Sequence, residues 1–282
     1  MSLITIRNEA LTVTVSTVGA ELQSILDENG VERLWQGDPQ FWASRAPILF
    51  PVAGGFRNDG YELDGQFYPM PKHGFVRKLA WEEETTTATA TTLLMRQKND
   101  GFPFDYELRA SFTLVGNALE VAYAVTNVGK TAFWYSVGSH EAFATPEGIE
   151  DYEIVFDTEE KVDNYPLVGN LILREPVTLA EKTSVLPLKY EYFAVDALVF
   201  RTLKSRGVTL KSATHAREIR VDFPGHDTLM LWTKPGAGYI CIEPWCNSPD
   251  FVDADLRIDH KPGFIRLGGG EKAVRQHTIT VR

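Results

Sequence analysis

Cysteine is scarce in this sequence, and long hydrophobic runs are missing from it. The 282 residues include two cysteines, Cys241 and Cys246, which are five positions apart with Pro244 between them. This spacing suits neither a zinc site nor a disulfide framework, so we expect two free, partly buried thiols in a reducing compartment. The start of the chain has no apolar stretch of signal-peptide length, and no later segment approaches about 18 uninterrupted apolar residues. We therefore expect a cytoplasmic protein that does not cross a membrane.

Basic residues are outnumbered by acidic ones and form no cluster along the chain. Lys and Arg total 28 against 38 Asp and Glu, which gives a formal net charge of −10. Such a surface repels nucleic-acid phosphates and anionic lipids, so we expect neither a nucleic acid nor a membrane as a partner. The sequence also lacks a serine-hydrolase elbow, a P-loop, a dinucleotide fingerprint and any recognised zinc spacing. Serine hydrolases, nucleotidases and dehydrogenases therefore have no support, and no metal site is expected.

Helical periodicity is almost absent, whereas alternation of apolar and polar residues runs from end to end. Typical segments are ALTVTVST (10–17), YELRASFTLV (106–115), ALEVAYAV (118–125), GVTLKS (207–212) and YICIEP (239–244). Gly116 and Asn117 favour a tight hairpin turn between the second and third of these segments. One short helix is expected near residues 38–44, where Asp38 can cap and Pro39 can occupy the first turn. Many short strands separated by turn residues predict an all-β fold, a large antiparallel β-sandwich.

No segment has the composition of an interdomain linker. Residues 157–190 are the least regular part and contain three prolines, but they lack the Gly/Ser or Pro-rich bias of a tether. We expect them to form a loop on one domain. No repeat of fixed period is evident, so residues 1–282 are predicted to form a single β-sandwich domain.

Glu243 interrupts an apolar strand. In YICIEPWCNSPD (239–250), alternation places Tyr239, Cys241 and Glu243 on one face and the two isoleucines on the other. Pro244 keeps Glu243 extended and ends the ladder. A carboxylate in this position needs hydrogen-bond donors or a shifted pKa. It either bonds a neighbouring arginine or loop amide, or it is a functional group in a cleft.

Two histidines lie in segments that also carry small residues. His73 and Gly74 follow two prolines in YPMPKHGFVRKLAW (68–81), where glycine permits the close approach of a ligand. His140 ends the aromatic strand of TAFWYSVGSHEAFATP (131–146), and its small neighbours leave the space that a binding cleft requires. Each is a candidate site residue, but a loop histidine that bonds the backbone or faces solvent gives the same pattern.

Two arginines flank a run that has the composition of a buried segment. ASRAPILFPVAGGFRNDGY (43–61) carries Arg45 before the apolar run and Arg57 after a Gly-Gly turn. A guanidinium there either binds several hydroxyls at once or pairs with a nearby carboxylate. The sequence leaves both interpretations open.

Five segments are informative when they are taken together and in order. They are RAPILFP (45–51), KHGFVR (72–77), VGSHEAF (137–143), DALVF (196–200) and WTKPGAGYICIEPW (232–245). The set resembles the aldose 1-epimerase (galactose mutarotase-like) family, and within it a bacterial LacX-like branch. The resemblance covers most of the chain and implies a single-domain β-sandwich (a galactose mutarotase-like supersandwich) with a sugar cleft on a concave sheet. It also implies interconversion of the α and β anomers of a free aldose, without a metal or organic cofactor.

The resemblance further implies roles for individual residues. Glu243 matches the family's general base, and His140 matches its general acid. His73 matches a second histidine that binds the sugar and supports charge on the ring oxygen. Asp196 matches an acid that binds sugar hydroxyls.

Arginines bear on a second hypothesis, a hexose-6-phosphate 1-epimerase. Arg45 matches a substrate-binding arginine of the neighbouring branch that acts on hexose 6-phosphates, and Arg77 matches that branch too. Together with Arg57 they could supply cations for a phosphate. Two further hypotheses are a non-catalytic carbohydrate-binding protein of the same fold and a glycosidase that uses Glu243 and Asp196. The expected partner is a small-molecule sugar, a hexose or hexose phosphate, bound by a monomer or a homodimer.

Overall fold

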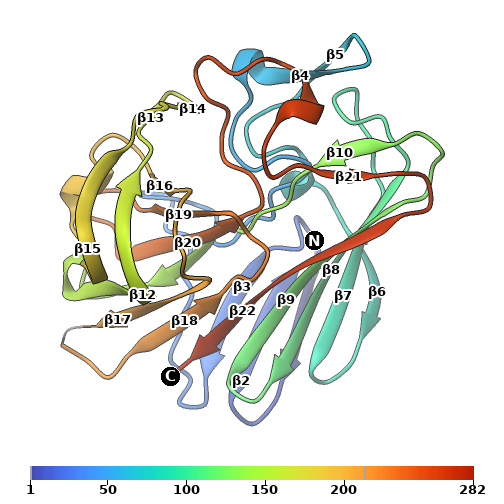
Figure 1. Ribbon diagram of the computed structural model, residues 1–282. Coiled ribbons are helices and arrows are strands. Elements are labelled where there is room, and N and C mark those ends of the chain that lie inside the picture. The colour runs from blue at the N-terminus through green and yellow to red at the C-terminus, as the bar shows by residue number, and fades with distance from the viewer. Residues whose placement is uncertain (1, 213) are drawn as a thin grey trace.

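The computed structural model describes residues 2–212 and 214–282, and β-strands dominate this part of the chain. Thirteen of the described strands form one long antiparallel sheet (Figure 1). In spatial order they are β11 (Glu141–Ala144), β20 (Tyr239–Trp245), β19 (Thr228–Trp232), β16 (Leu198–Phe200), β12 (Tyr152–Asn164), β17 (Gly207–Ser212), β18 (Glu218–Asp222), β22 (Lys272–Val281), β9 (Ala118–Asn127), β8 (Tyr106–Val115), β7 (Ala90–Met95) and β6 (Glu82–Thr86), with β15 (Val177–Pro187) attached to β12.

Smaller sheets and single helical turns complete the described residues. β1 (Leu3–Arg7), β2 (Leu11–Ser16) and β3 (Leu22–Asp27) form a second sheet. Two-stranded pairs are β4 (Gly60–Leu63) with β5 (Gln66–Pro69), β10 (Phe133–Tyr135) with β21 (Ile265–Leu267), and β13 (Leu167–Val168) with β14 (Leu171–Ile172). The 3-10 helices are η1 (Arg57–Asp59), η2 (Val76–Lys78), η3 (Ile149–Asp151), η4 (Tyr190–Phe193) and η5 (Ile258–His260). Among the helices that the structure describes, none has the length and apolar character to cross a membrane.

The second sheet packs its apolar face against the long sheet. β8 and β9 bury every second residue, and β1 and β2 show the same alternation. The inward side chains, among them Val13, Leu108 and Val121, join one apolar core. In Figure 1 the blue strands β1–β3 lie behind β22, β9 and β8. The predicted all-β fold with a large antiparallel sandwich is therefore confirmed.

The predicted hairpin turn is also present. β8 ends at Val115 and β9 begins at Ala118, so Gly116 and Asn117 form the two-residue connection. Gly116 has a φ of +58°, a left-handed value that glycine adopts without steric cost.

A turn replaces the short helix that we predicted near Asp38, so that prediction is wrong. The carbonyl of Asp38 accepts hydrogen bonds from Phe41 N (3.0 Å) and Trp42 N (2.9 Å). Arg45 N then donates to Glu21 Oε1 (2.7 Å), which takes the backbone out of a helical path. A single turn makes too few hydrogen bonds to offset the cost of helix nucleation.

Strands replace the loop that we predicted over residues 157–190. β12 and β15 form a long antiparallel pair at the left of Figure 1, and β13 and β14 connect them. The register of this pair shifts three times between Val155 and Asp163, and most of β15 is not buried. Bulges interrupt the period of two, and a strand outside the core needs no apolar alternation. The loop prediction is wrong because this hairpin carries no regular pattern.

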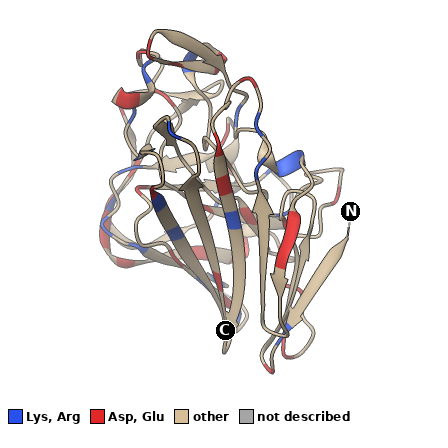
Figure 2. Cartoon of the chain, turned by 90° about the vertical axis from the view of Figure 1, so that its right-hand side faces the viewer, with Lys and Arg blue, Asp and Glu red and all other residues tan. Residues whose placement is uncertain are grey.

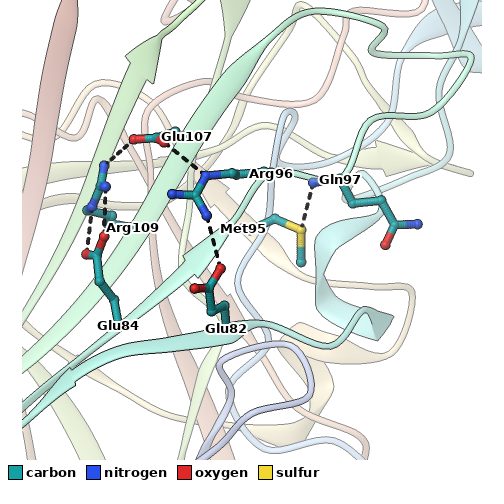
Figure 3. Close-up of polar contacts among 7 residues, drawn as sticks. All are labelled: Glu82, Glu84, Met95, Arg96, Gln97, Glu107 and Arg109. Atoms are coloured by element: carbon teal, nitrogen blue, oxygen red, sulfur yellow. Dashed lines mark hydrogen bonds and ion pairs between the residues drawn. The ribbon is translucent and has the colours of Figure 1, made fainter.

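Charged side chains protect the exposed edge of the long sheet. Every residue of β6 is exposed, including Glu82 and Glu84. Arg109 donates two hydrogen bonds to Glu84 (2.7 and 2.8 Å), and Arg96 bridges Glu82 and Glu107 (Figure 3). Charged edge strands discourage pairing with a second chain. Acidic and basic residues are interspersed on this side of the molecule (Figure 2).

We expect one buried histidine to make stability depend on pH. His226 is buried, and neither ring nitrogen has a hydrogen-bond partner among the described residues. Burial, assisted by the neighbouring His277 and Arg275, lowers the pKa of His226 to about 3. In the unfolded chain its pKa is near 6.5, so between these two values the unfolded state binds the extra proton, and stability falls as the pH falls. From pH 7.5 to pH 5 this histidine should remove about 2 kcal/mol from the free energy of unfolding.

Urea unfolding of His226→Leu at the two pH values checks this prediction. The variant should lose that part of the pH dependence, whereas His215→Leu, a matched change at an exposed histidine, should keep it. Equal pH dependence in wild type and His226→Leu would contradict the assignment.

Candidate active site

A cleft of about 580 Å³ opens over β19 and β20, a volume typical of small-molecule sites. Polar and aromatic side chains from distant parts of the sequence line it. The charged or titratable ones are Lys72, His73, Arg77, His140, Asp196, Lys234 and Glu243, and the tryptophans are Trp42, Trp232 and Trp245. Five of the seven residues predicted for the site therefore share one cleft.

His140 and Glu243 are held side by side by strand pairing. Glu141 of β11 lies opposite Ile242 of β20, so the side chains of His140 and Glu243 project together from the other face. His140 Nε2 is 3.4 Å from Glu243 Oε2. This is close enough for both groups to contact one small ligand.

His73 lies in a strained loop between β5 and η2. Its φ is +68°, and that of Gly74 is +66°. A Cβ atom on Gly74 would lie 1.9 Å from the carbonyl oxygen of Phe50, so only glycine fits. His73 Nδ1 accepts a hydrogen bond from Gly54 N (3.1 Å), and the neutral ring therefore carries its hydrogen on Nε2. This loop thus provides an N–H donor next to His140, whose ring centroid is 5.8 Å away.

Burial controls the protonation of all three groups. Glu243 is 1% exposed, and desolvation raises its pKa well above the usual value, although Lys72 acts in the opposite direction. Desolvation lowers the pKa of His140 to about 3, and Lys72 and Arg77 add to this effect. The pKa of His73 is also lowered well below 6.5, first by burial and then by His140. Both histidines are therefore neutral at pH 7.

Asp196 and Arg77 lie on the walls of the cleft. Asp196 follows η4, and its Oδ1 accepts a hydrogen bond from Ala197 N (2.8 Å). Arg77 lies in η2, and its guanidinium makes a long contact of 3.5 Å to the carbonyl oxygen of Lys72. A carboxylate and a cation are thus available to hydroxyl or anionic groups of a ligand.

Arg45 and Arg57 are not brought to the cleft. Arg45 donates to the carbonyl of Gln36 (2.7 Å), and Arg57 donates to the carbonyl of Ala254 (2.9 Å). Neither belongs to the described lining of the cleft. The geometry gives no support to the substrate-binding roles that we expected for these two arginines.

Sequence reasoning missed Lys72, Trp42 and Trp232. Lys72 directly precedes His73, and its charge acts on His73, His140 and Glu243. The ring centroids of Trp42 and Trp232 lie 4.8 and 5.7 Å from that of His140. Lys72 and Trp232 each begin one of the five informative segments, which was the available signal for them, whereas nothing in the local pattern marked Trp42.

The two cysteines are free and buried, so the prediction of free thiols is confirmed. Cys241 lies on the same face of β20 as Glu243. One candidate ligand atom from each of His140, Cys241 and Glu243 lies within 4.8 Å of the other two. These three side chains form a group that could hold a metal ion.

Comparisons with known proteins agree on one family. The family model described as aldose 1-epimerase matches residues 2–278. A protein named "Protein LacX, chromosomal" from Lactococcus lactis subsp. lactis is 33% identical over 295 residues, which cover 99% of each chain. A galactose mutarotase related enzyme from Lactobacillus acidophilus has a TM-score of 0.92 at 29% identity, covering 100% of this chain and 97% of that one. A galactose mutarotase-like protein from Lactobacillus casei ATCC 334 has a TM-score of 0.91 at 26% identity, covering 100% of both chains.

The resemblance seen in the five sequence segments is thus confirmed over nearly the whole chain, and so is the galactose mutarotase-like form of the β-sandwich. Membership implies a small-molecule sugar as the substrate and an epimerase type of reaction. This chain belongs to the aldose 1-epimerase family.

Proposed function

We propose that the protein interconverts the α and β anomers of a free aldose by opening and closing the sugar ring at C1. The observation that carries this proposal is the pairing of His140 and Glu243, 3.4 Å apart at the base of a cleft. Ring opening of a hemiacetal removes one proton from the anomeric hydroxyl and delivers another to the ring oxygen. An acid and a base must therefore act on the same carbon, and this pair provides both.

The reaction needs no group from outside the chain. Glu243 takes the proton of the C1 hydroxyl, the bond between C1 and the ring oxygen breaks, and His140 delivers a proton to that oxygen. Rotation about the C1–C2 bond then presents the other face of the aldehyde, and the reverse steps close the ring. The Nε2–H of His73 is a donor for the oxygen on which negative charge develops.

One proton shared by the buried pair supports these roles. At neutral pH the raised pKa of Glu243 and the lowered pKa of His140 favour a protonated carboxyl beside a neutral imidazole. The catalytic form, an ionised Glu243 beside a protonated His140, holds the same number of protons. Lys72 stabilises the carboxylate, so a transfer within the pair reaches this form without proton exchange with solvent.

A second candidate, a hexose-6-phosphate 1-epimerase, has support from Lys72, Arg77 and Lys234. All three cations line the same cleft as His140 and Glu243. A phosphate group would find charge-assisted hydrogen bonds there. The acid and base would keep the same roles.

Polarimetry of α-D-glucose and α-D-galactose with and without the protein tests the main proposal. We expect a rate of mutarotation above that of buffer, proportional to protein concentration, because each positioned acid or base contributes about 100-fold or more. Glucose 6-phosphate is measured in parallel. Acceleration of the phosphorylated sugar alone would establish the second candidate instead.

Acceleration of neither class of sugar, combined with sugar binding in calorimetry, would identify a non-catalytic carbohydrate-binding protein. Lys72→Met and Arg77→Met separate the two enzymatic candidates further. They should weaken the reaction of a phosphorylated sugar more than that of a neutral one, because a phosphate needs the lost charges.

A further inference from the structure

Cys241 is buried beneath the cleft, next to the lining residues His140 and Glu243, and has no part in the proposed reaction. The alternation of β20 places its thiol on the face that carries Glu243, and pairing with β11 brings His140 to the same place. One ligand atom from each side chain lies within 4.8 Å of the other two, and all three residues are buried. Three different donor types therefore converge on one point.

Two polar atoms of this group have unmet hydrogen-bonding capacity. His140 Nδ1 and Glu243 Oε2 are buried and have no hydrogen-bond partner in the described part of the chain. Buried polar atoms without a partner cost free energy, which a bound ligand can recover. Of the two, Glu243 Oε2 also lies 3.4 Å from His140 Nε2, so a cation held between these atoms would supply the partner that Oε2 lacks.

The distances suit a tetrahedral ion. Two ligand atoms bound to Zn²⁺ at 2.0–2.1 Å are about 3.4 Å apart. His140 Nε2 and Glu243 Oε2 already have this separation, 3.4 Å. A sulfur bound at 2.3 Å would lie about 3.5 Å from either atom. The three ligand atoms are at most 4.8 Å apart in the structure, so small side-chain movements would bring all three to bonding distance of one ion.

The chemical types of the three ligand atoms indicate which metal ion would bind. Ca²⁺ and Mg²⁺ require shells of six or more oxygen ligands, whereas thiolate, imidazole and carboxylate together suit Zn²⁺. Burial raises the pKa of both Cys241 and Glu243, so the ion must displace a proton from each of them on binding. The resulting thiolate and carboxylate neutralise its two charges, which offsets the opposing charge of Lys72. Three protein ligands leave a fourth position open toward the cleft.

We propose that His140, Cys241 and Glu243 form a Zn²⁺ site, and that the bound ion inhibits the protein because it occupies the atoms that handle protons in the reaction. Binding of the ion does not depend on the proposed function. Inhibition does depend on it, so the two are measured separately.

Metal binding is measured by titrating Zn²⁺ into the chelator-treated protein in a calorimeter. The matched variants are Cys241→Ala and Cys246→Ala, which remove the two buried thiols one at a time. Wild type and Cys246→Ala should bind one ion tightly, and Cys241→Ala should bind it roughly 100-fold more weakly. Co²⁺ should give a thiolate charge-transfer band in wild type and Cys246→Ala but not in Cys241→Ala.

Equal Zn²⁺ affinity in wild type and Cys241→Ala, or no thiolate band in wild type, would overturn the proposal. The band in Cys246→Ala, where Cys241 is the one remaining cysteine, decides the matter even if Cys241→Ala fails to fold. For inhibition, each protein is assayed with Zn²⁺ and with EDTA, and the ratio of the two rates is compared. The rate with Zn²⁺ divided by the rate with EDTA should be well below one in wild type and Cys246→Ala, and near one in Cys241→Ala. Tight Zn²⁺ binding by a protein that shows no mutarotation in EDTA would contradict the proposed function but support the metal site.

Discussion

Glu243→Gln and His140→Asn should each lower kcat/KM for mutarotation by about 100-fold to 10,000-fold. The glutamine variant would keep the size of the side chain but could not accept a proton, and an asparagine in place of the histidine could not deliver one. A loss of this size corresponds to about 3 to 5 kcal/mol of transition-state stabilisation. Polarimetry at several protein concentrations measures it against the spontaneous reaction.

The two groups should also behave as a unit. They lie 3.4 Å apart, and in the proposed mechanism they share one proton, so the double variant should be hardly slower than the slower single variant. If the two residues acted independently, the rate loss of the double variant would instead be the product of the two single losses. His260→Asn, at an exposed histidine outside the cleft, is the control and should keep the wild-type rate.

Stability should not follow activity in these variants. Glu243 is a buried carboxyl group whose Oε2 lacks a hydrogen-bond partner among the described residues, and glutamine keeps the size of this side chain without placing a charge in the core. Thermal unfolding of Glu243→Gln should therefore occur at or above the wild-type temperature. A variant that is inactive because it is unfolded, or one that retains more than about a third of the wild-type rate, would contradict the assignment of the base.

The parts of the fold that were predictable from sequence are those governed by one local rule. Alternation in the segments around Gly116 and Asn117 fixes both the strands and the face that each side chain occupies. The same rule identified Glu243 as a carboxylate where an apolar side chain was expected. It failed in β12 and β15, where bulges and exposure remove the alternation, and near Asp38, where a contact with Glu21 decides the path.

The candidate site was predictable only where a motif fixes the backbone. His73 is held by a left-handed loop and His140 by a strand end, so their side chains have little choice of direction. Arg45 and Arg57 have long, flexible side chains, and both bond nearby carbonyl groups instead of reaching the cleft. Trp42 reaches His140 from a turn distant in sequence, which no local pattern encodes. The single domain, the oligomeric state and the cytoplasmic location stay predictions.

His277→Leu should lower the free energy of unfolding by about 3 to 5 kcal/mol. His277 Nε2 lies 2.9 Å from Glu141 Oε1, and the two side chains are 0% and 3% exposed. Glu141 Oε2 has no hydrogen-bond partner within the described residues. Removal of the imidazole would therefore leave a buried carboxylate without a partner, which is among the most costly changes in a core. Urea unfolding monitored by tryptophan fluorescence measures the loss.

A double-mutant cycle separates the contact between His277 and Glu141 from simple packing. Glu141→Met with His277→Leu should recover much of the stability lost in the single variant, since no unpaired charge remains. The exposed pair Asp255 and His260, 2.7 Å apart, provides the matched control, and His260→Leu should cost less than about 1 kcal/mol. A loss in His277→Leu no larger than that of the control would refute the argument.

The position of this pair connects the core to the cleft. Glu141 follows His140 in the chain, and the two side chains project from opposite faces of the same sheet. Ser139, on the other side of His140, places its hydroxyl 3.3 Å from the ring of His277, and its carbonyl oxygen accepts a hydrogen bond from Trp245 Nε1 (3.0 Å). Loss of His277 should therefore loosen the backbone on both sides of His140. Mutarotation by a His277→Leu variant should decline at temperatures below its unfolding transition, whereas the double variant, with a neutral core, should decline less.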